Sequence, residues 1–169
     1  MANEFGFAKI NSGAGDYNPI AFLIAQALSG LSTIKMVRVE AVYPRDGDTG
    51  PTVDLMPLVT QIDPTGQSYP HAIIHGVPVF EMQSGSTAFF LTPTVGDKGA
   101  AIFCDRDIST VKQTGKVSLP GSRRQMDWAD GLYIGGFLNG AATQFITGDV
   151  TGINVTSPTG AVALKTFTG

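Results

Sequence analysis

The segment that most constrains the fold of this chain is its last 24 residues, Ile146 to Gly169. It holds six threonines and four glycines among apolar and β-branched residues, and its only charges are Asp149 and Lys165. This composition favours strands, yet a lone two-stranded ribbon is marginal in water and its unpaired edges invite association. The segment therefore predicts an oligomer in which each copy supplies strands that the others lack.

The composition of the whole chain agrees with this prediction. At 169 residues, one domain with appendages is the natural expectation. Only 15% of the residues are charged, well below the usual quarter, whereas 43% are hydrophobic. The ten phenylalanines and many valines and isoleucines argue against disorder. We expect a turn-rich β protein with much of its surface covered by other subunits.

The charge pattern bears on partners. The net charge is −3, and the 11 basic residues are spread thinly, with Arg123-Arg124 as the only adjacent basic pair. Nucleic-acid-binding proteins normally carry a basic face or stripe. We therefore expect no nucleic-acid partner.

The chain also carries signals about its compartment. Cys104 is the only cysteine, which excludes an internal disulfide, and its apolar surroundings indicate a buried, inert thiol rather than a reactive one. Residues 1–15 lack the basic start and apolar run of a signal peptide. The longest apolar stretch is too short to span a bilayer. We expect assembly in a reducing cytoplasm.

The clearest helix signal follows an irregular arm at residues 1–16. Asn18 can cap the helix, Pro19 suits its first position, and Gly30 can end it. Helical spacing relates six apolar residues, Ile20, Leu23, Ile24, Ala27, Leu28 and Leu31. The opposite face is hardly more polar, so we expect burial on more than one side. Packing on its own domain, wedging between subunits and docking on a partner all remain open.

Strand signals begin at residue 34. Five are expected, at Ile34–Tyr43, Thr52–Ile62, Ile73–Val79, Ser86–Leu91 and Ala100–Asp105, with Pro57 marking a bulge or an edge. Gly96-Asp97 makes the hairpin turn into the last of them. Five short strands suit the five-stranded Greek-key barrel called the OB-fold. The chain would then divide into an arm and helix at 1–33, a barrel at 34–122, a connector at 123–145 and a β stem at 146–169.

Catalytic residues are hard to find in this sequence. His71 and His75 have the i, i+4 spacing of a zinc helix, but alanine stands where a metalloprotease needs its glutamate. We interpret the two histidines as surface or interface residues. Four aspartates could in principle supply a carboxylate pair but are interpreted as solvated loop residues: Asp105, Asp107, Asp127 and Asp130. We expect neither an enzyme nor a cofactor.

Three stretches, in this order, resemble the barrel of the short central-spike proteins of contractile-tailed bacteriophages: Gly76–Val79, Pro93–Asp97 and Phe103–Ile108. A connector resembles that family's exit from the barrel, where an arginine and a D-x-x-x-I-x-G-F run lead into the spike. Its residues are Arg123, Trp128, Asp130, Tyr133 and Phe137. The motif resemblance covers about residues 35–137.

The resemblance implies a homotrimer with an N-terminal OB-fold and a C-terminal β-helical needle of intertwined strands. Such a protein is a virion component of the tail baseplate, caps the tube through a hub protein, and pierces the host outer membrane mechanically. Three copies of the tail would place six apolar residues on a common axis: Val150, Ile153, Val155, Val162, Leu164 and Phe167.

Two departures from that family shape our expectations. The family's apex binds iron through a His-x-His motif, and this chain has no histidine after His75, so we expect no apex metal. We also expect a spike that is blunt or is completed by a separate tip protein. The N-terminal helix is assigned to hub docking or trimer packing.

The main alternative is an OB-fold module that binds single-stranded nucleic acid or oligosaccharide. It would need basic and aromatic residues on exposed strand faces. The aromatic side chains Phe89, Phe90 and Phe103 lie in apolar runs and are expected to be buried. This expectation makes the structural interpretation the stronger one.

Overall fold

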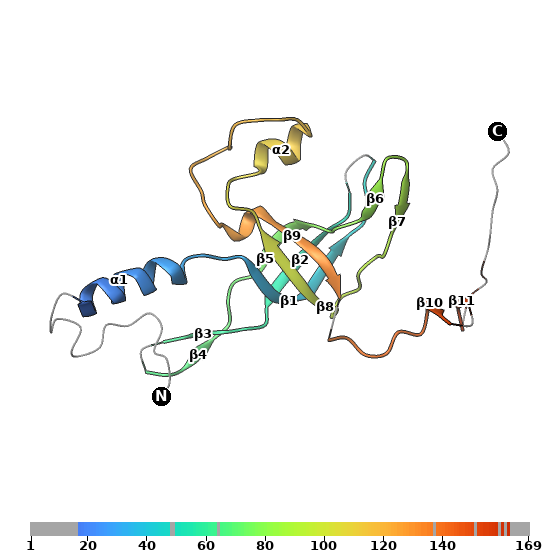
Figure 1. Cartoon of the computed structure of the whole chain (residues 1–169), viewed down its shortest axis with the longest axis horizontal. Coiled ribbons are helices and arrows are strands. Elements are labelled where there is room, and N and C mark those ends of the chain that lie inside the picture. Colours follow the sequence, from blue (N-terminus) through green and yellow to red (C-terminus); the bar gives the residue numbers. More distant parts are fainter. Residues whose placement is uncertain are drawn as a thin grey trace. The chain divides into compact units, whose positions relative to one another are not determined.

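The computed structural model describes residues 17–47, 50–63, 65–136, 138–150, 152–158, 160 and 162 (Figure 1). The chain is mainly β and divides into two compact units, Met1–Leu138 and Asn139–Gly169. Among the described residues, none of the helices has the length and apolarity needed to cross a membrane.

Helix α1 spans Tyr17–Ser29, which confirms a helix that ends before Gly30, but Asn18 lies inside its first turn and not at the expected cap. Pro19 lies in the first turn, where a missing N–H leaves no hydrogen bond unmade. No acidic residue occupies its first turn and no basic residue its last. Four of its apolar side chains, Ile20, Leu23, Ile24 and Leu28, are more than half exposed in the single chain, whereas Phe22 is partly buried. The burial expected from the sequence is therefore not provided by the described residues of the same chain.

The central feature of the first unit is a curled, five-stranded antiparallel half-barrel (Figure 1). Its strands are ordered β5-β2-β1-β8-β9. Their bounds are Ile34–Tyr43 for β1, Thr52–Pro57 for β2, Ile74–Pro78 for β5, Lys98–Phe103 for β8 and Gly131–Gly136 for β9. The order β8-β1-β2-β5 is that of a Greek key, in which the fourth strand returns to lie beside the first.

The two edges of this sheet meet. Val79 and Tyr133 form a parallel bridge, and the Phe80 N–H donates to the Tyr133 carbonyl oxygen at 2.7 Å. Register shifts interrupt three of the four ladders, for example between Val39 and Ala41 in β1. Such bulges bend a strand and increase its twist. They supply the curvature that brings β5 and β9 together.

The core lies inside this curl. Val37 and Val39 are fully buried while Arg38 is exposed, as the alternation in the sequence predicts, and the bulge at Glu40 then leaves Ala41 only half-buried. Each buried aliphatic side chain contributes about 1.5–3 kcal/mol. The cluster consists of Val37, Val39, Val53, Leu55, Ile74, Val77, Val79, Ala101, Phe103 and Tyr133.

Gly99 makes room for the largest of these side chains. A Cβ at this position would lie 2.0 Å from the Gly135 carbonyl oxygen and 2.7 Å from the Tyr133 ring. Burial, together with the negative charge of Asp97, raises the pKa of Tyr133. Its hydroxyl has no hydrogen-bond partner among the described residues.

The structure corrects two of the expected strands. Ser86–Leu91 was expected to be the fourth barrel strand, but β7 (Thr87–Phe89) pairs with β6 (Met82–Ser84) in a separate hairpin. Phe89 and Phe90 are consequently exposed, so their expected burial is wrong, whereas Phe103 is buried as expected. The fifth strand of the sheet is β9, which lies in the segment expected to be a connector.

Thr52–Ile62 is likewise not one strand. β2 ends at Pro57, which cannot donate to a ladder, and β3 (Gln61–Ile62) instead pairs with β4 (Ser68–Tyr69). The expected turn before β8 is confirmed, but it does not join a hairpin, because β7 pairs with β6 while β8 pairs with β1 and β9. The Thr94 N–H donates to the Asp97 carboxylate at 2.8 Å, and Gly96 takes the positive φ of +94° that favours glycine.

The second unit contains a hairpin of β10 (Phe145–Asp149) and β11 (Gly152–Thr156). Ile146 pairs with Val155 and Gly148 with Ile153, so these four residues share one face. Phe145, Thr147, Asp149 and Asn154 lie on the other. Val150 lies in the turn, Val162 is exposed, and Leu164 and Phe167 lie outside the described residues. The first strand of this hairpin thus begins before the expected stem and holds part of the expected connector.

Candidate functional site

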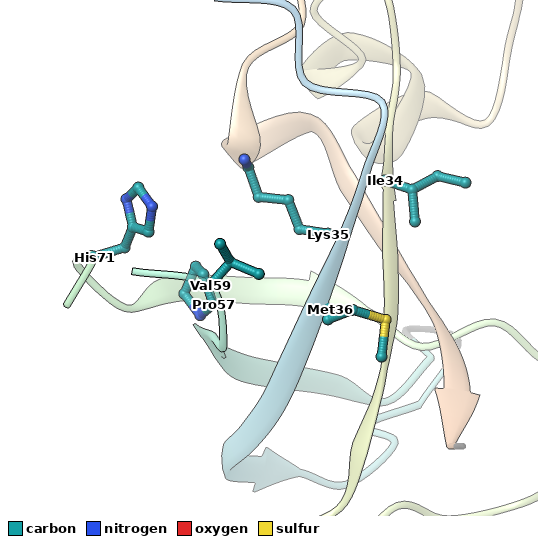
Figure 2. A pocket seen from close by; sticks show the side chains of 6 residues that line it. All are labelled: Ile34, Lys35, Met36, Pro57, Val59 and His71. Atoms are coloured by element: carbon teal, nitrogen blue, oxygen red, sulfur yellow. The ribbon is translucent and has the colours of Figure 1, made fainter. Parts of the chain in front are cut away.

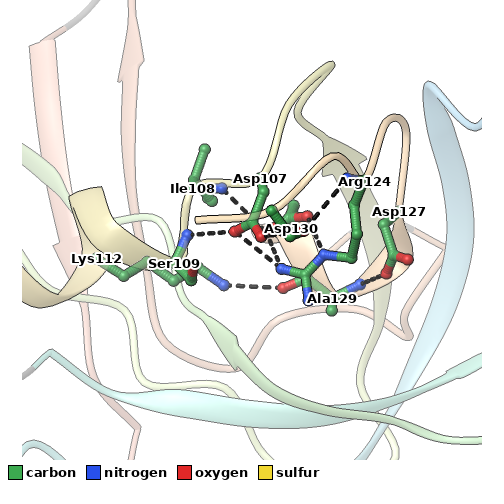
Figure 3. Close-up of polar contacts among 9 residues, drawn as sticks. Asp107, Ile108, Ser109, Lys112, Arg124, Asp127, Ala129 and Asp130 are labelled. Atoms are coloured by element: carbon green, nitrogen blue, oxygen red, sulfur yellow. Dashed lines mark hydrogen bonds and ion pairs between the residues drawn. The ribbon is translucent and has the colours of Figure 1, made fainter. Parts of the chain in front are cut away.

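The connection between β8 and β9 is fastened by an ionic cluster around Arg124 (Figure 3). The Arg124 Nη2 atom lies 2.9 Å from Asp107 Oδ1 and 3.1 Å from Asp130 Oδ1, and its Nε atom donates to Asp130 Oδ2 at 3.2 Å. Both carboxylate side chains are only 2% exposed. The two-pronged contact with Asp130 is the strong, directional form of an arginine–carboxylate pair.

Further donors complete the cluster. Asp107 accepts from the Ser122 hydroxyl at 2.6 Å and from the Ser109 N–H at 2.8 Å, and Asp130 accepts from the Ile108 N–H at 3.1 Å. Hydrogen bonds from Ser109 and Ser122, with the Arg124 charge, hold the pKa of Asp107 far below its usual range. These contacts anchor both sides of helix α2 (Ser109–Thr114), whose Lys112 donates to the Ala129 carbonyl at 2.9 Å.

This cluster corrects the expectation that the four aspartates of the region are solvated. Asp107 and Asp130 are buried, and Asp127 caps the short 3-10 helix η1 (Trp128–Asp130) by accepting from the Ala129 N–H at 2.9 Å. Asp105 alone remains an exposed loop residue without such a role. Because donors engage both buried carboxylates, the arrangement suits fastening a loop better than transferring protons.

A second polar cluster surrounds the buried Asp54 of β2. It accepts from His75 Nδ1 at 2.7 Å, the Gly76 N–H at 3.0 Å and the Tyr43 hydroxyl at 3.2 Å. Burial alone would raise the pKa of Asp54, but the hydrogen bonds from Gly76, His75 and Tyr43 outweigh it and lower this pKa. The hydrogen bond to Asp54 raises the pKa of Tyr43. The cluster ties β1, β2 and β5 together.

The two histidines of the HAIIH motif have different neighbours. His75 pairs with Asp54 and is largely exposed, whereas His71 lies edge-on to Trp128, with ring centroids 4.7 Å apart. Burial and the Lys35 charge lower the pKa of His71. Within the described residues, no three histidine, cysteine, aspartate or glutamate side chains gather as a metal site would require.

Trp128 contacts His71 and Lys35, two of the residues that line a groove of about 310 Å³ at the start of β1 (Figure 2). Its indole N–H donates to the Ser32 hydroxyl at 2.7 Å, and Lys35 Nζ lies 4.5 Å from its ring centroid. Figure 2 shows Lys35 pointing from β1 to the side on which His71 lies, while Ile34 points the other way. The groove is lined by Ile34, Lys35, Met36, Pro57, Val59 and His71.

Exposed apolar side chains gather in three places. The first is helix α1, and the second is the face of the β10–β11 hairpin that carries Ile146, Ile153 and Val155. The third is the β6–β7 hairpin and its flanks, where Arg45 lies 5.3 Å from the Phe90 ring centroid and pairs with Glu81. This patch consists of Phe80, Met82, Phe89, Phe90 and Leu91. Monomeric soluble proteins rarely expose this much apolar surface, so these faces are candidate assembly surfaces.

The expected connector residues thus have separate places in the structure. Tyr133 belongs to the core, Asp130 to the ionic cluster and Trp128 to the border of the groove. Arg123 lines a cavity beside the cluster, and Phe137 lies outside the described residues. The sequence missed the cluster because its members lie 6 and 17 positions apart, with no periodic signal to connect them.

Comparison with known proteins identifies one family. The profile described as the phage protein Gp138 N-terminal domain matches residues 46–136, which is more than half of the chain. The matched range runs from before β2 to the end of β9 and so includes the Arg124 cluster and, apart from Tyr43, the Asp54 cluster. No curated protein matches the chain.

Proposed function

The chain belongs to the family of phage protein Gp138 N-terminal domains, and from this premise we propose that it is the central spike of a contractile phage tail. Family membership supports a structural role in the virion. The finer proposal is a homotrimeric spike, or spike collar, at the tip of the baseplate. It caps the tail tube through a hub protein and helps to pierce the host outer membrane mechanically.

The observation that carries this proposal is the apolar face of the β10–β11 hairpin. Ile146, Ile153 and Val155 are each more than half exposed in the single chain, while the opposite face carries Thr147, Asn154 and Asp149, with Phe145 at its end. A lone hairpin of this kind is marginally stable. Three copies that turn this face inward would bury nine such side chains and leave Thr147 and Asn154 in water.

Helix α1 supports the same reading independently. An isolated helix of 13 residues is marginal in water, and tertiary packing of its apolar face normally stabilises it. Because four of its large apolar side chains are exposed in the single chain, a partner surface is needed to cover them. We propose that this surface is either another copy or the hub protein.

The barrel is proposed to be an OB-fold. Two features support it, the Greek-key order β8-β1-β2-β5 and the parallel bridge between Val79 and Tyr133 that brings the sheet edges together. An OB-fold is a partly open Greek-key barrel of five strands. A rigid barrel of this kind would act as the collar above a stem.

The mass of the protein in solution tests the trimer. A monomer has a mass of 17.7 kDa, so light scattering coupled to sizing chromatography should give about 53 kDa, three times that value. Ile153→Asp places a charge on the apolar face and should lower the mass. Thr147→Asp adds the same charge to the polar face and should leave the trimer intact. A wild-type monomer, or equal behaviour of the two variants, would contradict the proposal.

The place in the virion needs a separate test. Electron cryo-microscopy of intact tails from the phage that encodes this chain should show three copies of the half-barrel at the tip of the baseplate. Labelled antibody against the barrel should bind the same end. Copies found along the tube, or none in the purified tail, would rule out the spike.

A second function has one observation in its favour. The exposed Phe89 and Phe90, with Arg45 over the Phe90 ring, resemble the aromatic and basic platform on which single-stranded nucleic acids or sugars stack. Fluorescence anisotropy with labelled single-stranded DNA at low salt tests the nucleic-acid half. Binding that is lost in Phe90→Ala and kept in Leu91→Ala would favour this function over a purely mechanical one.

A further inference from the structure

The five arginines of this chain divide into two groups by their partners. Arg38 pairs with Glu40, Arg45 with Glu81, and Arg124 with Asp107 and Asp130. Arg106 and Arg123 have no ion pair or hydrogen bond from their side chains to the described part of the chain. Pairing is thus the rule for arginines in this protein, and the two exceptions call for an explanation.

Both exceptions line the same cavity. It has a volume of about 550 Å³, and no acidic residue is among the residues lining it: Arg106, Leu119, Pro120, Ser122, Arg123 and Gln125. Two guanidinium groups beside one cavity repel each other, and this repulsion costs the least when an anion lies between them. Among the described residues, the lining of the cavity thus supplies no negative charge to balance the two arginines.

The ionic cluster holds this cavity in shape. Arg106 directly precedes Asp107, and Arg123 lies between Ser122 and Arg124, both of which bind Asp107. The Arg124 N–H also donates to the Ser122 hydroxyl at 3.2 Å. The residues next to Arg106 and Arg123 are thus held by contacts with the partly buried cluster, so the two free arginines extend from anchored positions.

The adjacent pair Arg123-Arg124 is consequently split into two roles. The guanidinium of Arg124 points into the buried cluster (Figure 3), whereas Arg123 is one of the residues that line the cavity. A site of this size takes one or two anionic groups. It does not provide the long basic stripe that a nucleic-acid backbone requires, in keeping with the net charge of −3.

We propose that this cavity binds a phosphomonoester through Arg106 and Arg123. Guanidinium groups match the geometry of phosphate oxygens with paired N–H donors, and the Gln125 amide can add a further donor. The Ser122 hydroxyl is already donated to Asp107, which leaves the arginines as the main contacts. Leu119 and Pro120 provide an apolar wall, which suits an organic phosphate better than the bare ion.

The same chemistry occurs in a soluble sugar phosphate and in the headgroup of a phospholipid. Titration calorimetry with glucose 1-phosphate, with unphosphorylated glucose as the blank, tests the first source. Co-sedimentation with phosphatidylcholine vesicles, with and without phosphatidic acid, tests the second. Saturable binding to glucose 1-phosphate but not to glucose supports the site and points to a soluble ligand. Saturable binding to vesicles only when they contain phosphatidic acid supports the site and points to a lipid headgroup.

Variants assign the binding to the two arginines. Arg106→Gln and Arg123→Gln should each weaken binding at least tenfold, and raising the salt concentration should weaken the wild type. Arg38→Gln, which breaks an exposed pair on β1, is the matched control and should bind like the wild type. Arg106→Lys and Arg123→Lys keep the positive charge but lose the paired N–H donors, so each should still weaken binding severalfold. They replace the glutamine variants if those fail to fold.

Two results would overturn the proposal. One is the absence of saturable binding in both arms, and the other is binding by the double variant Arg106→Gln/Arg123→Gln at wild-type strength. The site lies within the first unit and does not depend on the trimer. The mass in solution and this binding therefore succeed or fail separately.

Discussion

The hydrogen bond between Trp128 and Ser32 offers a quantitative test of how the chain following α1 is attached to the barrel. It joins residues 96 positions apart, with the indole Nε1 donating to Ser32 Oγ at 2.7 Å. Ser32 is only 8% exposed, and the next residue is also anchored, because the Phe103 N–H donates to the Thr33 carbonyl oxygen at 3.0 Å. Trp128→Phe removes the donor and keeps an aromatic ring.

The expected loss of folding stability has three contributions. A net hydrogen bond contributes about 0.5–1.5 kcal/mol, and leaving a buried hydroxyl without its donor adds about 1 kcal/mol. The weaker attraction of Lys35 for a phenyl ring adds a few tenths, because cation–π contacts at exposed sites are worth about 0.5–1 kcal/mol. Trp128→Phe should therefore destabilise the protein by about 2 kcal/mol. Ser32→Ala should cost about 1 kcal/mol.

The double variant separates the hydrogen bond from the rest. Urea unfolding of the wild type, the two single variants and the double variant gives the coupling energy. All four are measured at one protein concentration, because oligomers unfold in a concentration-dependent way. We expect about 1 kcal/mol, since residues in direct contact are not additive. Coupling below about 0.3 kcal/mol would refute the reasoning, because the two changes would then act independently.

Three further predictions concern the barrel. Gly99→Ala should destabilise it by about 3 kcal/mol in urea unfolding, because its Cβ would lie 2.0 Å from the Gly135 oxygen, whereas Gly50→Ala, whose Cβ would meet no atom closer than 3.8 Å, should be nearly neutral. Leu55→Ala should cost about 2–5 kcal/mol, and the exposed Val59→Ala should cost under about 1 kcal/mol; equal losses would contradict the assigned core. The pKa of Asp54 is lowered from its ordinary value of 3.8. The ionised carboxylate therefore stabilises the fold fully above pH 3.8, and this contribution is lost as the pH falls below that value. Asp54→Asn should therefore flatten the acid side of a plot of Tm against pH, and an unchanged slope would exclude this role.

The parts of the fold that the sequence predicted are those encoded by neighbouring residues. Helix α1 follows from Asn18-Pro19 and Gly30, because capping and helix termination act over a single turn. β1 follows from alternation around Val37 and Val39, and the turn before β8 from Gly96-Asp97. Each of these signals is local. The helix, the strand and the turn are confirmed, whereas Asn18 lies inside the helix and not at its cap, and the turn does not join a hairpin.

The parts that the sequence did not predict depend on distant partners. β9 is rich in glycine and has little alternation, and its place in the sheet depends on Gly99 making room for Tyr133. Phe89 and Phe90 have strong strand propensity, but β7 has only β6 to pair with, so hydrophobicity alone wrongly indicated burial. The Arg124 cluster joins residues separated by loops, and no spacing rule anticipates it.

The central claim is that three chains pack the Ile146, Ile153 and Val155 face of their hairpins against one another. Cysteine cross-linking tests it most directly, in a Cys104→Ser background that removes the only native thiol. Val155→Cys lies on the apolar face and should form disulfide-linked dimers within the trimer on mild oxidation. Asn154→Cys, one residue away on the polar face, should not. Cross-linking of the Asn154 variant alone, or of neither variant, would contradict the account.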